Sequence, residues 1–230
     1  MPSIVIAAPV LPGKTNVGRE FGKAVMGEKR KEMTESRLSI GEVRETVCLY
    51  RTPLGDSIAV LIEASDPVWA NKQFAASKTP FDTWFKTKAK EVTGVDYNQP
   101  LPPLEHLFEA RIGTPSNNLI VWAAPILSGK TPAARALFKD LSTTRAKDYL
   151  ASMVRAGKTH ESVWLMPSPM GEFATGYTEG PNLQKSMDYV STSKDAYDGW
   201  YRSRMLEIFG LDMAKDPFPM PEIIIDWQWR

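Results

Sequence analysis

Apolar and polar positions along this 230-residue chain follow one pattern that occurs twice. Residues 4–15 read IVIAAPVLPGKT, and residues 120–131 read IVWAAPILSGKT. The same spacing of 116 residues pairs, further along, Glu45 with Glu161, Glu63 with Glu179, Asp82 with Asp198 and Trp84 with Trp200. A register that holds without a gap over such a distance indicates two copies of one ancestral unit.

Each copy predicts the element order strand, helix, strand, strand, helix, strand. In the first copy, residues 4–10 are a short apolar run typical of a strand. Residues 15–39 are polar with spaced apolar positions, which predicts one amphipathic helix that ends at Gly41. Strands are then expected at 45–51 and 57–64, helical segments at 68–77 and 81–93, and a last strand at 105–112, with its counterpart at 222–229.

This order predicts an α+β fold. A βαββαβ unit forms a four-stranded antiparallel sheet with its helices on one face, and the other face is left apolar. We therefore expect two ferredoxin-like repeats that form an intrachain pseudo-dimer, sheet against sheet. The first repeat is expected to span 1–112, the polar, turn-rich stretch 113–118 is the expected linker, and the second repeat spans 119–230.

Composition and charge narrow the class of partner. The net charge of +1 creates no field that favours nucleic acid or a lipid surface, so we expect neither as a partner. Cys48 is the single cysteine, which is typical of a reducing compartment, and no basic segment precedes the short apolar run at the start. We expect a cytoplasmic monomer, because the internal fusion provides the pairing that dimerisation would otherwise provide.

The chain resembles the dimeric α+β barrel superfamily in its tandem, fused form. The resemblance rests on the first strand running into Pro-Gly-Lys (12–14) or Ser-Gly-Lys (128–130) before a long helix, on the glutamate that opens the hairpin, and on the aromatic-rich helices around Trp84 and Trp200. Members include cofactor-free monooxygenases, haem-handling enzymes, polyketide cyclases and uncharacterised proteins. The resemblance implies a small-molecule pocket between sheet and helices, and it transfers no catalytic residue.

Two repeated motifs have structural explanations. The Gly-Lys-Thr segments at 13–15 and 129–131 fit a relaxed phosphate-loop pattern, but Pro9 and Pro12 remove backbone donors that such a loop needs. A turn into a helix is favoured, with a weaker anion site at the helix N-terminus left open. Thr79, Pro80 and Asp82 read as an N-cap, a proline at the first helical position and an acidic residue in the first turn.

The repeated glutamates are the candidate catalytic groups. Strand alternation places Glu45, Val47 and Leu49 on one face, which we expect to pack on the unit's own helices. Glu45 or Glu63 would then lie near a sheet–helix pocket, where burial raises a carboxyl pKa and makes a general base. Glu161 and Glu179 would be the ligand-binding counterparts. The alternative is that these glutamates lie solvated, or paired with lysine, at strand ends.

Aromatic residues and a histidine complete the candidate ligand-binding set: Tyr50, Trp84, Trp200 and His106. Both tryptophans also fit a core role. His106 would be the axial ligand in a haem-binding alternative, but we expect no cofactor and no metal, since no cluster of three or four donors is visible. Ile6/Trp122, Cys48/Trp164 and Tyr50/Met166 differ between the copies, which favours a pocket kept in the first half and filled by tryptophan in the second.

The sequence therefore predicts a small-molecule-binding protein. Cofactor-free acid/base or oxygenation chemistry in a sheet–helix pocket is the leading hypothesis. A non-catalytic structural or stress-related interaction protein and a haem-binding protein are the alternatives.

Overall fold

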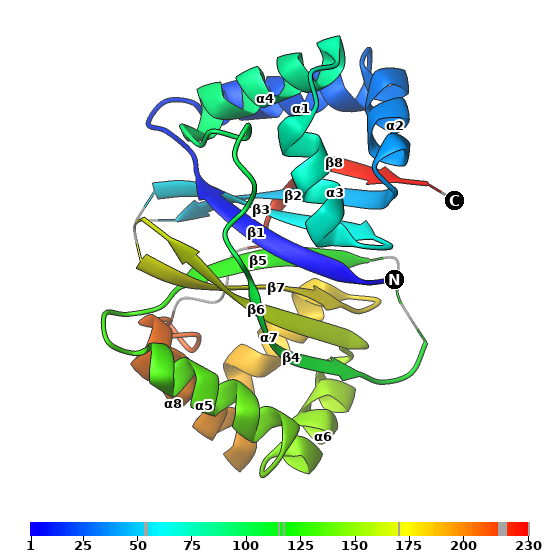
Figure 1. Cartoon of the computed structure of the whole chain (residues 1–230). Helices are drawn as coiled ribbons and strands as arrows, with labels where there is room; N and C mark the ends of the chain where they lie inside the picture. The colour runs from blue at the N-terminus through cyan, green and yellow to red at the C-terminus, as the bar shows by residue number, and fades with distance from the viewer. Residues whose placement is uncertain (53–54, 115, 117, 170, 216–219, 230) are drawn as a thin grey trace. The chain divides into compact units, whose positions relative to one another are not determined.

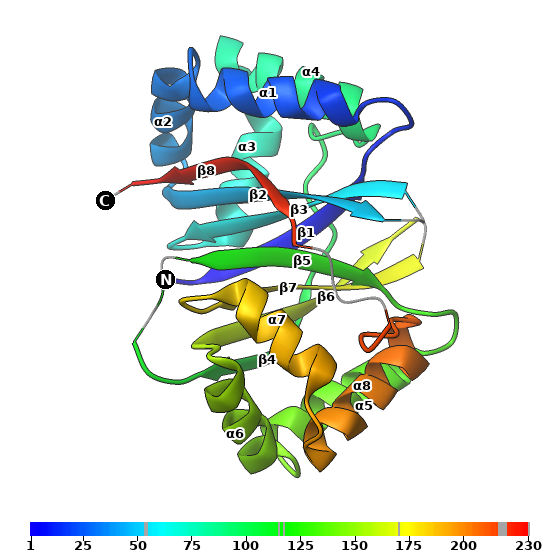
Figure 2. The same cartoon turned by 180° about the vertical axis from the view of Figure 1, so that it is seen from behind.

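The computed structural model describes residues 1–230 except 53–54, 115, 117, 170, 216–219 and 230. It divides into two compact units, Met1–Pro102 with Pro221–Arg230, and Pro103–Met220. Each unit is an antiparallel four-stranded sheet with four helices against one face (Figures 1 and 2). The α+β class and the antiparallel sheets predicted from the sequence are confirmed.

The first unit has the strand order β1-β3-β2-β8. Its strands are β1 (Ser3–Pro9), β2 (Glu42–Thr52), β3 (Gly55–Ala64) and β8 (Glu222–Gln228). Its helices are α1 (Thr15–Met26), α2 (Arg30–Ser39), α3 (Pro67–Ala76) and α4 (Pro80–Thr93).

The second unit has the strand order β4-β6-β7-β5. Its strands are β4 (Glu105–Arg111), β5 (Leu119–Pro125), β6 (His160–Ser168) and β7 (Gly171–Glu179). Its helices are α5 (Thr131–Ser142), α6 (Ala146–Ala156), α7 (Leu183–Thr192) and α8 (Ala196–Phe209).

The last strand of each sequence repeat joins the sheet of the other repeat. β4 belongs to the first copy but pairs with β6, and β8 belongs to the second copy but pairs with β2. The compact units therefore differ from the repeats 1–112 and 119–230, in which each copy was expected to complete its own sheet. The expected linker 113–118 lies inside the second unit, and its residues 115 and 117 are outside the described residues.

The last strands also show that the gap-free register ends before them. Glu105 opens β4 and Glu222 opens β8, which is a spacing of 117 residues and not 116. The ion pairs agree, because Arg19 binds Glu222 at 2.8 Å and its counterpart Arg135 binds Glu105 at 2.8 Å. One residue has thus been gained before β8, and the same arginine–glutamate contact anchors each exchanged strand.

The predicted helix 15–39 is two helices. α1 ends at Met26 with Gly27 as its C-cap, and α2 begins at Arg30. The chain turns at Gly27, which lets Met33 and Arg37 of α2 become fully buried. Gly41, expected to end the helical run, has a φ of +71°, a conformation that favours glycine.

Local signals at the other helices behave as the sequence predicts. Thr79 caps α4 by accepting from the Asp82 backbone N–H at 3.1 Å, and Pro80 occupies the first turn. Gly94 ends this helix in the left-handed conformation. In the second unit Asp195 caps α8 by accepting from the Tyr197 N–H at 2.9 Å.

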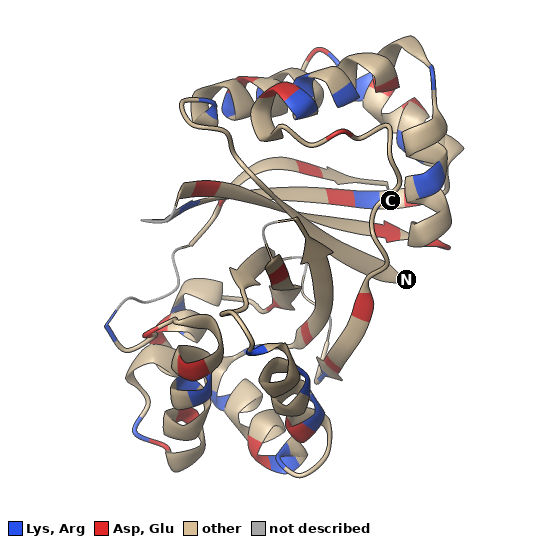
Figure 3. Ribbon diagram, turned by 60° about the vertical axis from the view of Figure 1, so that its left-hand side comes forward, with Lys and Arg blue, Asp and Glu red and all other residues tan. Residues whose placement is uncertain are grey.

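Lysine and arginine alternate with aspartate and glutamate on the helices of both units (Figure 3). Most ion pairs join residues three or four apart on one helix or tie a helix to a neighbouring element. Within the described ranges, no helix is long and apolar enough to cross a lipid bilayer.

Candidate functional site

A cavity lies between the sheet and the helices of the first unit. All four strands contribute to its floor, and α1, α3 and α4 form its walls. Most of the lining is apolar: Ile6, Phe21, Ile40, Val47, Ile58, Val60, Ile62, Ala70, Phe74, Phe85, Ala89, Val92, Ile224 and Ile225. This is the sheet–helix location that the sequence predicts for a pocket.

The cavity is partly open and has a volume of about 70 Å³. That volume corresponds to roughly five water molecules, at about 15 Å³ each. It is smaller than the apolar cavity of about 150 Å³ that holds benzene in a well-studied case. A ring-sized ligand therefore enters only if side chains such as Phe21 and Phe74 turn aside, or if part of it stays in the mouth.

One end of the cavity is polar and is built around Arg37. The Arg37 Nε donates to Glu45 Oε2 at 2.6 Å and lies 3.4 Å from Glu42 Oε2. The guanidinium packs against the rings of Phe74 and Phe85, with 4.5 Å to each centroid, and the two rings are perpendicular to each other. All three charged side chains are almost completely buried, so one cation faces two carboxyl groups in a medium of low polarity.

Glu42 is the group at this end that is not fully satisfied. Its Oε1 is buried and has no hydrogen-bond partner among the described residues. Burial, reinforced by the neighbouring Glu45 carboxylate and opposed by Arg37, raises the pKa of Glu42 well above its ordinary value. The protonated form is thereby favoured, which leaves Arg37 with two carboxylate neighbours, Glu45 and Asp82.

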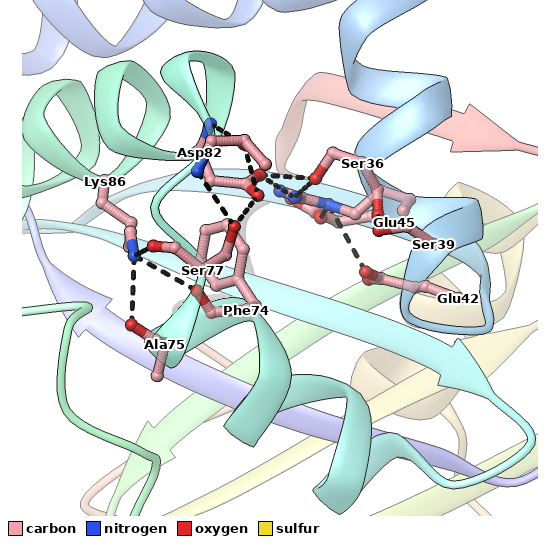
Figure 4. Close-up of polar contacts among 11 residues, drawn as sticks. Ser36, Ser39, Glu42, Glu45, Phe74, Ala75, Ser77, Asp82 and Lys86 are labelled. Atoms are coloured by element: carbon pink, nitrogen blue, oxygen red, sulfur yellow. Dashed lines mark hydrogen bonds and ion pairs between the residues drawn. The ribbon is translucent and has the colours of Figure 1, made fainter.

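A network behind the site holds Arg37 in place. Asp82 accepts hydrogen bonds from Ser36, Ser77 and Thr79, and it lies 3.7 Å from the Arg37 guanidinium (Figure 4). Burial would raise the pKa of Asp82, but these hydrogen bonds hold it below its usual value. Asp82 is therefore a structural carboxylate that joins α2 to α4, beyond its role in the first turn of α4.

Lys86 extends this network to the end of α3. Its ammonium donates to the carbonyls of Phe74, Ala75 and Ser77 at 2.7–3.2 Å (Figure 4). The carbonyls at a helix C-terminus have no partners within the helix, and a cation there satisfies them. Lys86 thus fixes the segment that carries Phe74 and the Asp82-binding Ser77.

The second unit has a smaller cavity at the matching place, with a volume of about 50 Å³. Here the repeated glutamate, Glu161, accepts from Lys158 Nζ at 2.9 Å and from the Thr178 hydroxyl at 3.2 Å. The Thr178 hydroxyl in turn accepts from the Trp122 indole N–H at 3.2 Å. Positions 37 and 42 of the first copy, arginine and glutamate, are Met153 and Lys158 in the second. Each repeated glutamate therefore has a cationic partner, but the partners stand at different positions of the repeat. Arg37 pairs with Glu45, and Lys158, which corresponds to position 42, pairs with Glu161.

Trp122 lines this second cavity, whereas Trp164 does not. A Cβ atom on Gly176 would come within 2.6 Å of the Trp122 ring, so glycine is required beneath the indole. The first copy has Ile6 and Val60 at these two positions. The larger volume of Trp122 relative to Ile6 is thus accommodated by the smaller volume of Gly176 relative to Val60. Trp164 stacks on Tyr177 at 6.0 Å.

Of the predicted glutamates, Glu45 and Glu161 line the two cavities, but Glu63 and Glu179 do not. Glu63 is half-buried on β3, between Ile62, which lines the cavity, and Ala64. Strand alternation directs it to the opposite face of the sheet. Glu179 lies beside His160, at 3.3 Å, and accepts from the Ser116 backbone N–H.

The predicted aromatic and histidine ligands also lie away from both cavities. Tyr50 is buried on β2, on the face that alternates with Leu49. Trp84 packs on Phe21 and Phe81, each at 5.6 Å, and Trp200 lies 4.9 Å from the Arg145 guanidinium. His106 is exposed on β4 and bonds to the Ser162 hydroxyl at 3.0 Å. None of these four lines a described cavity.

Sequence reasoning missed Glu42 and Arg37 for identifiable reasons. Glu42 and Glu45 are three residues apart, which regular alternation would place on opposite faces. A register shift between Glu42 and Arg44 brings both to the cavity. Arg37 was hidden in a helix read as continuous from 15 to 39. A comparison of the two copies could have found them. Glu45 is kept as Glu161, whereas Arg37 and Glu42 change together, to Met153 and Lys158.

The Gly-Lys-Thr segments are engaged within the protein. Lys14 pairs with Glu91 at 3.2 Å, and the Thr15 hydroxyl donates to Asp56. Lys130–Glu207 and Thr131–Glu172 repeat both contacts. This favours the turn-into-helix interpretation. Among the described residues, no group of three or more histidine, cysteine, aspartate or glutamate side chains is placed to hold a metal ion.

Two solved structures are similar to the chain over almost its whole length. One, from Fusobacterium nucleatum subsp. nucleatum, bears the name "Putative monooxygenase"; it is 9% identical, with a TM-score of 0.51, and the match covers 98% of this chain and 93% of that one. The other is an anthrone oxidase-like protein that is 12% identical, with a TM-score of 0.51 and coverage of 99% and 94%. No protein-family model matches the chain, and no curated protein gives a significant match.

Identities this low show the fold alone. Both neighbours have the dimeric α+β barrel fold, and the two four-stranded antiparallel sheets of this chain agree with it. The α+β fold with two four-stranded antiparallel sheets, predicted from the sequence, is therefore confirmed.

Proposed function

We propose that the first unit binds a small, neutral, mainly apolar molecule in the cavity beside Glu42 and exchanges a proton with it. The observation that carries the proposal is the Glu42 Oε1 atom, which is buried at the edge of an apolar cavity and has no partner among the described residues. A buried polar atom without a partner costs about 1–3 kcal/mol, and a ligand hydroxyl or carbonyl that meets it recovers this energy.

Charge balance selects a neutral ligand. With Glu42 protonated, the positive charge of Arg37 already faces two carboxylates, Glu45 at 2.6 Å and Asp82 at 3.7 Å. A charged ligand would add an uncompensated charge to a buried site, which is strongly unfavourable. A hydrogen bond to Glu45 also helps to raise the pKa of Glu42, and the unpartnered Oε1 keeps acceptor capacity, so the carboxyl suits a ligand hydroxyl such as that of an alcohol or a phenol.

The same carboxyl suits acid/base chemistry. A carboxyl group whose pKa is raised by burial titrates closer to neutral pH and transfers protons more effectively there. Arg37 and Glu45, held by the Asp82 network, keep the position of the group fixed and stay as a pair while Glu42 gains or loses its proton. Glu42 is thus the proposed catalytic residue, and Arg37 and Glu45 are positioning residues.

Oxygenation is the second candidate, and the names of the two structural neighbours favour it. A cofactor-free reaction of this kind would need dioxygen and a substrate whose C–H proton is taken by Glu42 in its carboxylate form. It therefore uses the same cavity and the same proton transfer.

Binding is tested with p-cresol, a neutral phenol, against toluene and benzoate as matched apolar and anionic probes. We expect p-cresol to raise the melting temperature in a concentration-dependent way, since a ligand that binds only the folded state stabilises it. Toluene is expected to bind more weakly and benzoate not at all. Thr93→Phe, which introduces the residue found at position 209 in the second copy, should fill the cavity and remove the effect.

Proton transfer is tested separately with 5-nitrobenzisoxazole, a neutral aromatic compound. A base removes its C–H proton while the N–O bond breaks, and the released phenolate is coloured. We expect turnover that increases with pH as Glu42 ionises and that Glu42→Gln abolishes. Equal rates for the parent protein and Glu42→Gln would refute the acid/base role. The binding role would be refuted separately, if p-cresol raised the melting temperature no more than toluene or benzoate does.

A further inference from the structure

The cavity of the second unit has an unused hydrogen-bond donor at its polar end. Lys158 is buried, and its ammonium has three N–H donors. Within the part of the chain that the structure describes, Glu161 is the one acceptor within hydrogen-bonding distance of it, at 2.9 Å. Lys158 therefore has donor capacity left at the edge of an apolar cavity.

The walls of this cavity differ in kind from those of the first. Three methionines, Met187, Met205 and Met213, line it together with the rings of Trp122 and Tyr201. Methionine side chains are flexible and make favourable sulfur–aromatic contacts of about 0.3–1.5 kcal/mol each. Such walls adapt to a ligand larger than the present volume of about 50 Å³, and they favour an aromatic ring.

The polar surroundings favour a neutral ligand with an oxygen acceptor. Lys158 and Glu161 already compensate each other, so a charged ligand would remain unpaired. Two buried tyrosines, Tyr149 and Tyr197, lie close enough to Glu161 to feel its charge but do not line the cavity. Burial, and then the Glu161 carboxylate, raises the pKa of both, so they stay protonated.

We infer that the second unit contains a second, separate binding site, which takes a neutral aromatic molecule with a carbonyl or ether oxygen that accepts a hydrogen bond from Lys158. The site lacks a counterpart of Glu42, because position 158 provides the cation that Arg37 provides in the first unit. It therefore binds its ligand without the acid/base group of the first site. The inference does not depend on the function proposed for the first unit.

Methyl NMR separates the two sites, because their linings differ in residue type. Six isoleucines line the first cavity and one, Ile120, lines the second, whereas the methionines named above line only the second. The full chain is labelled at methionine and isoleucine methyl groups and titrated with acetophenone. We expect the signals of Met187, Met205 and Met213 to shift saturably, with toluene binding about tenfold more weakly because it cannot accept from Lys158.

Two variants control the titration. Val190→Phe introduces the residue of the first copy, Phe74, and should fill the second cavity and abolish the methionine shifts. Lys158→Met with Glu161→Gln removes both charges together, and it should reduce acetophenone affinity to that of toluene. Methionine signals that do not move, or that saturate equally in the double variant, would overturn the inference. The isoleucine signals report the first site independently, so failure of one site is distinguishable from failure of the other.

Discussion

Arg37 and Glu42 decide the chemistry of the first cavity. Glu45, identified from its repetition, lines the cavity, and its Oε2 already accepts a hydrogen bond from Arg37 at 2.6 Å. The unsatisfied atom belongs to Glu42, which the copies do not share. Glu45, which is repeated as Glu161, has a structural role in both units. Glu42, which is replaced by Lys158 in the second copy, gives the first unit its own chemistry.

The raised pKa of Glu42 predicts a pH-dependent stability difference. The folded state holds the proton more tightly than the unfolded state, whose value is near 4.5, so stability is complete below 4.5 and decreases as pH rises through the folded pKa. Glu42→Gln mimics the protonated group and removes this loss. The free energy of unfolding of this variant relative to the parent should therefore rise with pH above 4.5, by at most about 1.4 kcal/mol per pH unit. A difference that is constant from pH 4 to 8 would contradict a raised pKa.

Exchange of charged residues between the copies gives a second test. Arg37→Met leaves two buried carboxyl groups without their cation and should lower the free energy of unfolding by about 3–5 kcal/mol. Adding Glu42→Lys to Arg37→Met recreates the arrangement of Met153, Lys158 and Glu161. The double variant should therefore regain most of the lost free energy of unfolding. Urea unfolding of the parent, the single and the double variants measures both effects. A double variant no more stable than Arg37→Met would show that the two arrangements are not equivalent.

At the scale of elements, much could be predicted from the sequence. The apolar runs, Gly94 and the Thr79–Pro80 cap locate most strands and helices because these signals are local. Three features could not be found this way. The break at Gly27 divides a helix whose pattern reads as continuous, the register shift at Glu42 interrupts alternation, and the exchange of β4 and β8 depends on long-range pairing.

Helix α1 packs so closely on β8 that a side chain at one position is excluded. A Cβ atom on Gly22 would lie 2.4 Å from the Ile224 carbonyl oxygen, which is backbone and cannot turn aside. Gly22→Ala should lower the free energy of unfolding by about 1–3 kcal/mol. Gly199→Ala is the matched control in α8, where the added atom meets nothing closer than 3.9 Å, and it should raise stability by about 0.5–1 kcal/mol. Thermal unfolding in which both variants behave alike would argue against this close contact.

At the scale of the whole molecule, the exchange of last strands makes each unit depend on both copies. Ile225 and Trp227 of β8 are fully buried in the core of the first unit, although they end the second copy. The chain thus provides within itself a strand that a separate copy would otherwise provide. Our expectation of a monomer follows from this and is open to analytical ultracentrifugation.

Removal of the last ten residues tests this dependence. Without β8, the edge of β2 loses its partner strand and the core loses Ile225 and Trp227. The methyl signals of the cavity isoleucines that remain, Ile6, Ile40, Ile58 and Ile62, should collapse to the positions of an unfolded chain, and a synthetic peptide of residues 221–230 should restore them. Signals that stay dispersed in the truncated chain would show that the first unit does not need the exchanged strand.

The state of the Glu42 carboxyl group is the central claim, and the pH titration of its side-chain carbon by ¹³C NMR tests it most directly. We predict a midpoint well above the ordinary value of 4.5, and a further displacement of that midpoint when p-cresol is bound. Glu42→Gln identifies the signal by its absence. A midpoint near 4.5 that p-cresol leaves unchanged would contradict both the buried proton and its contact with a ligand.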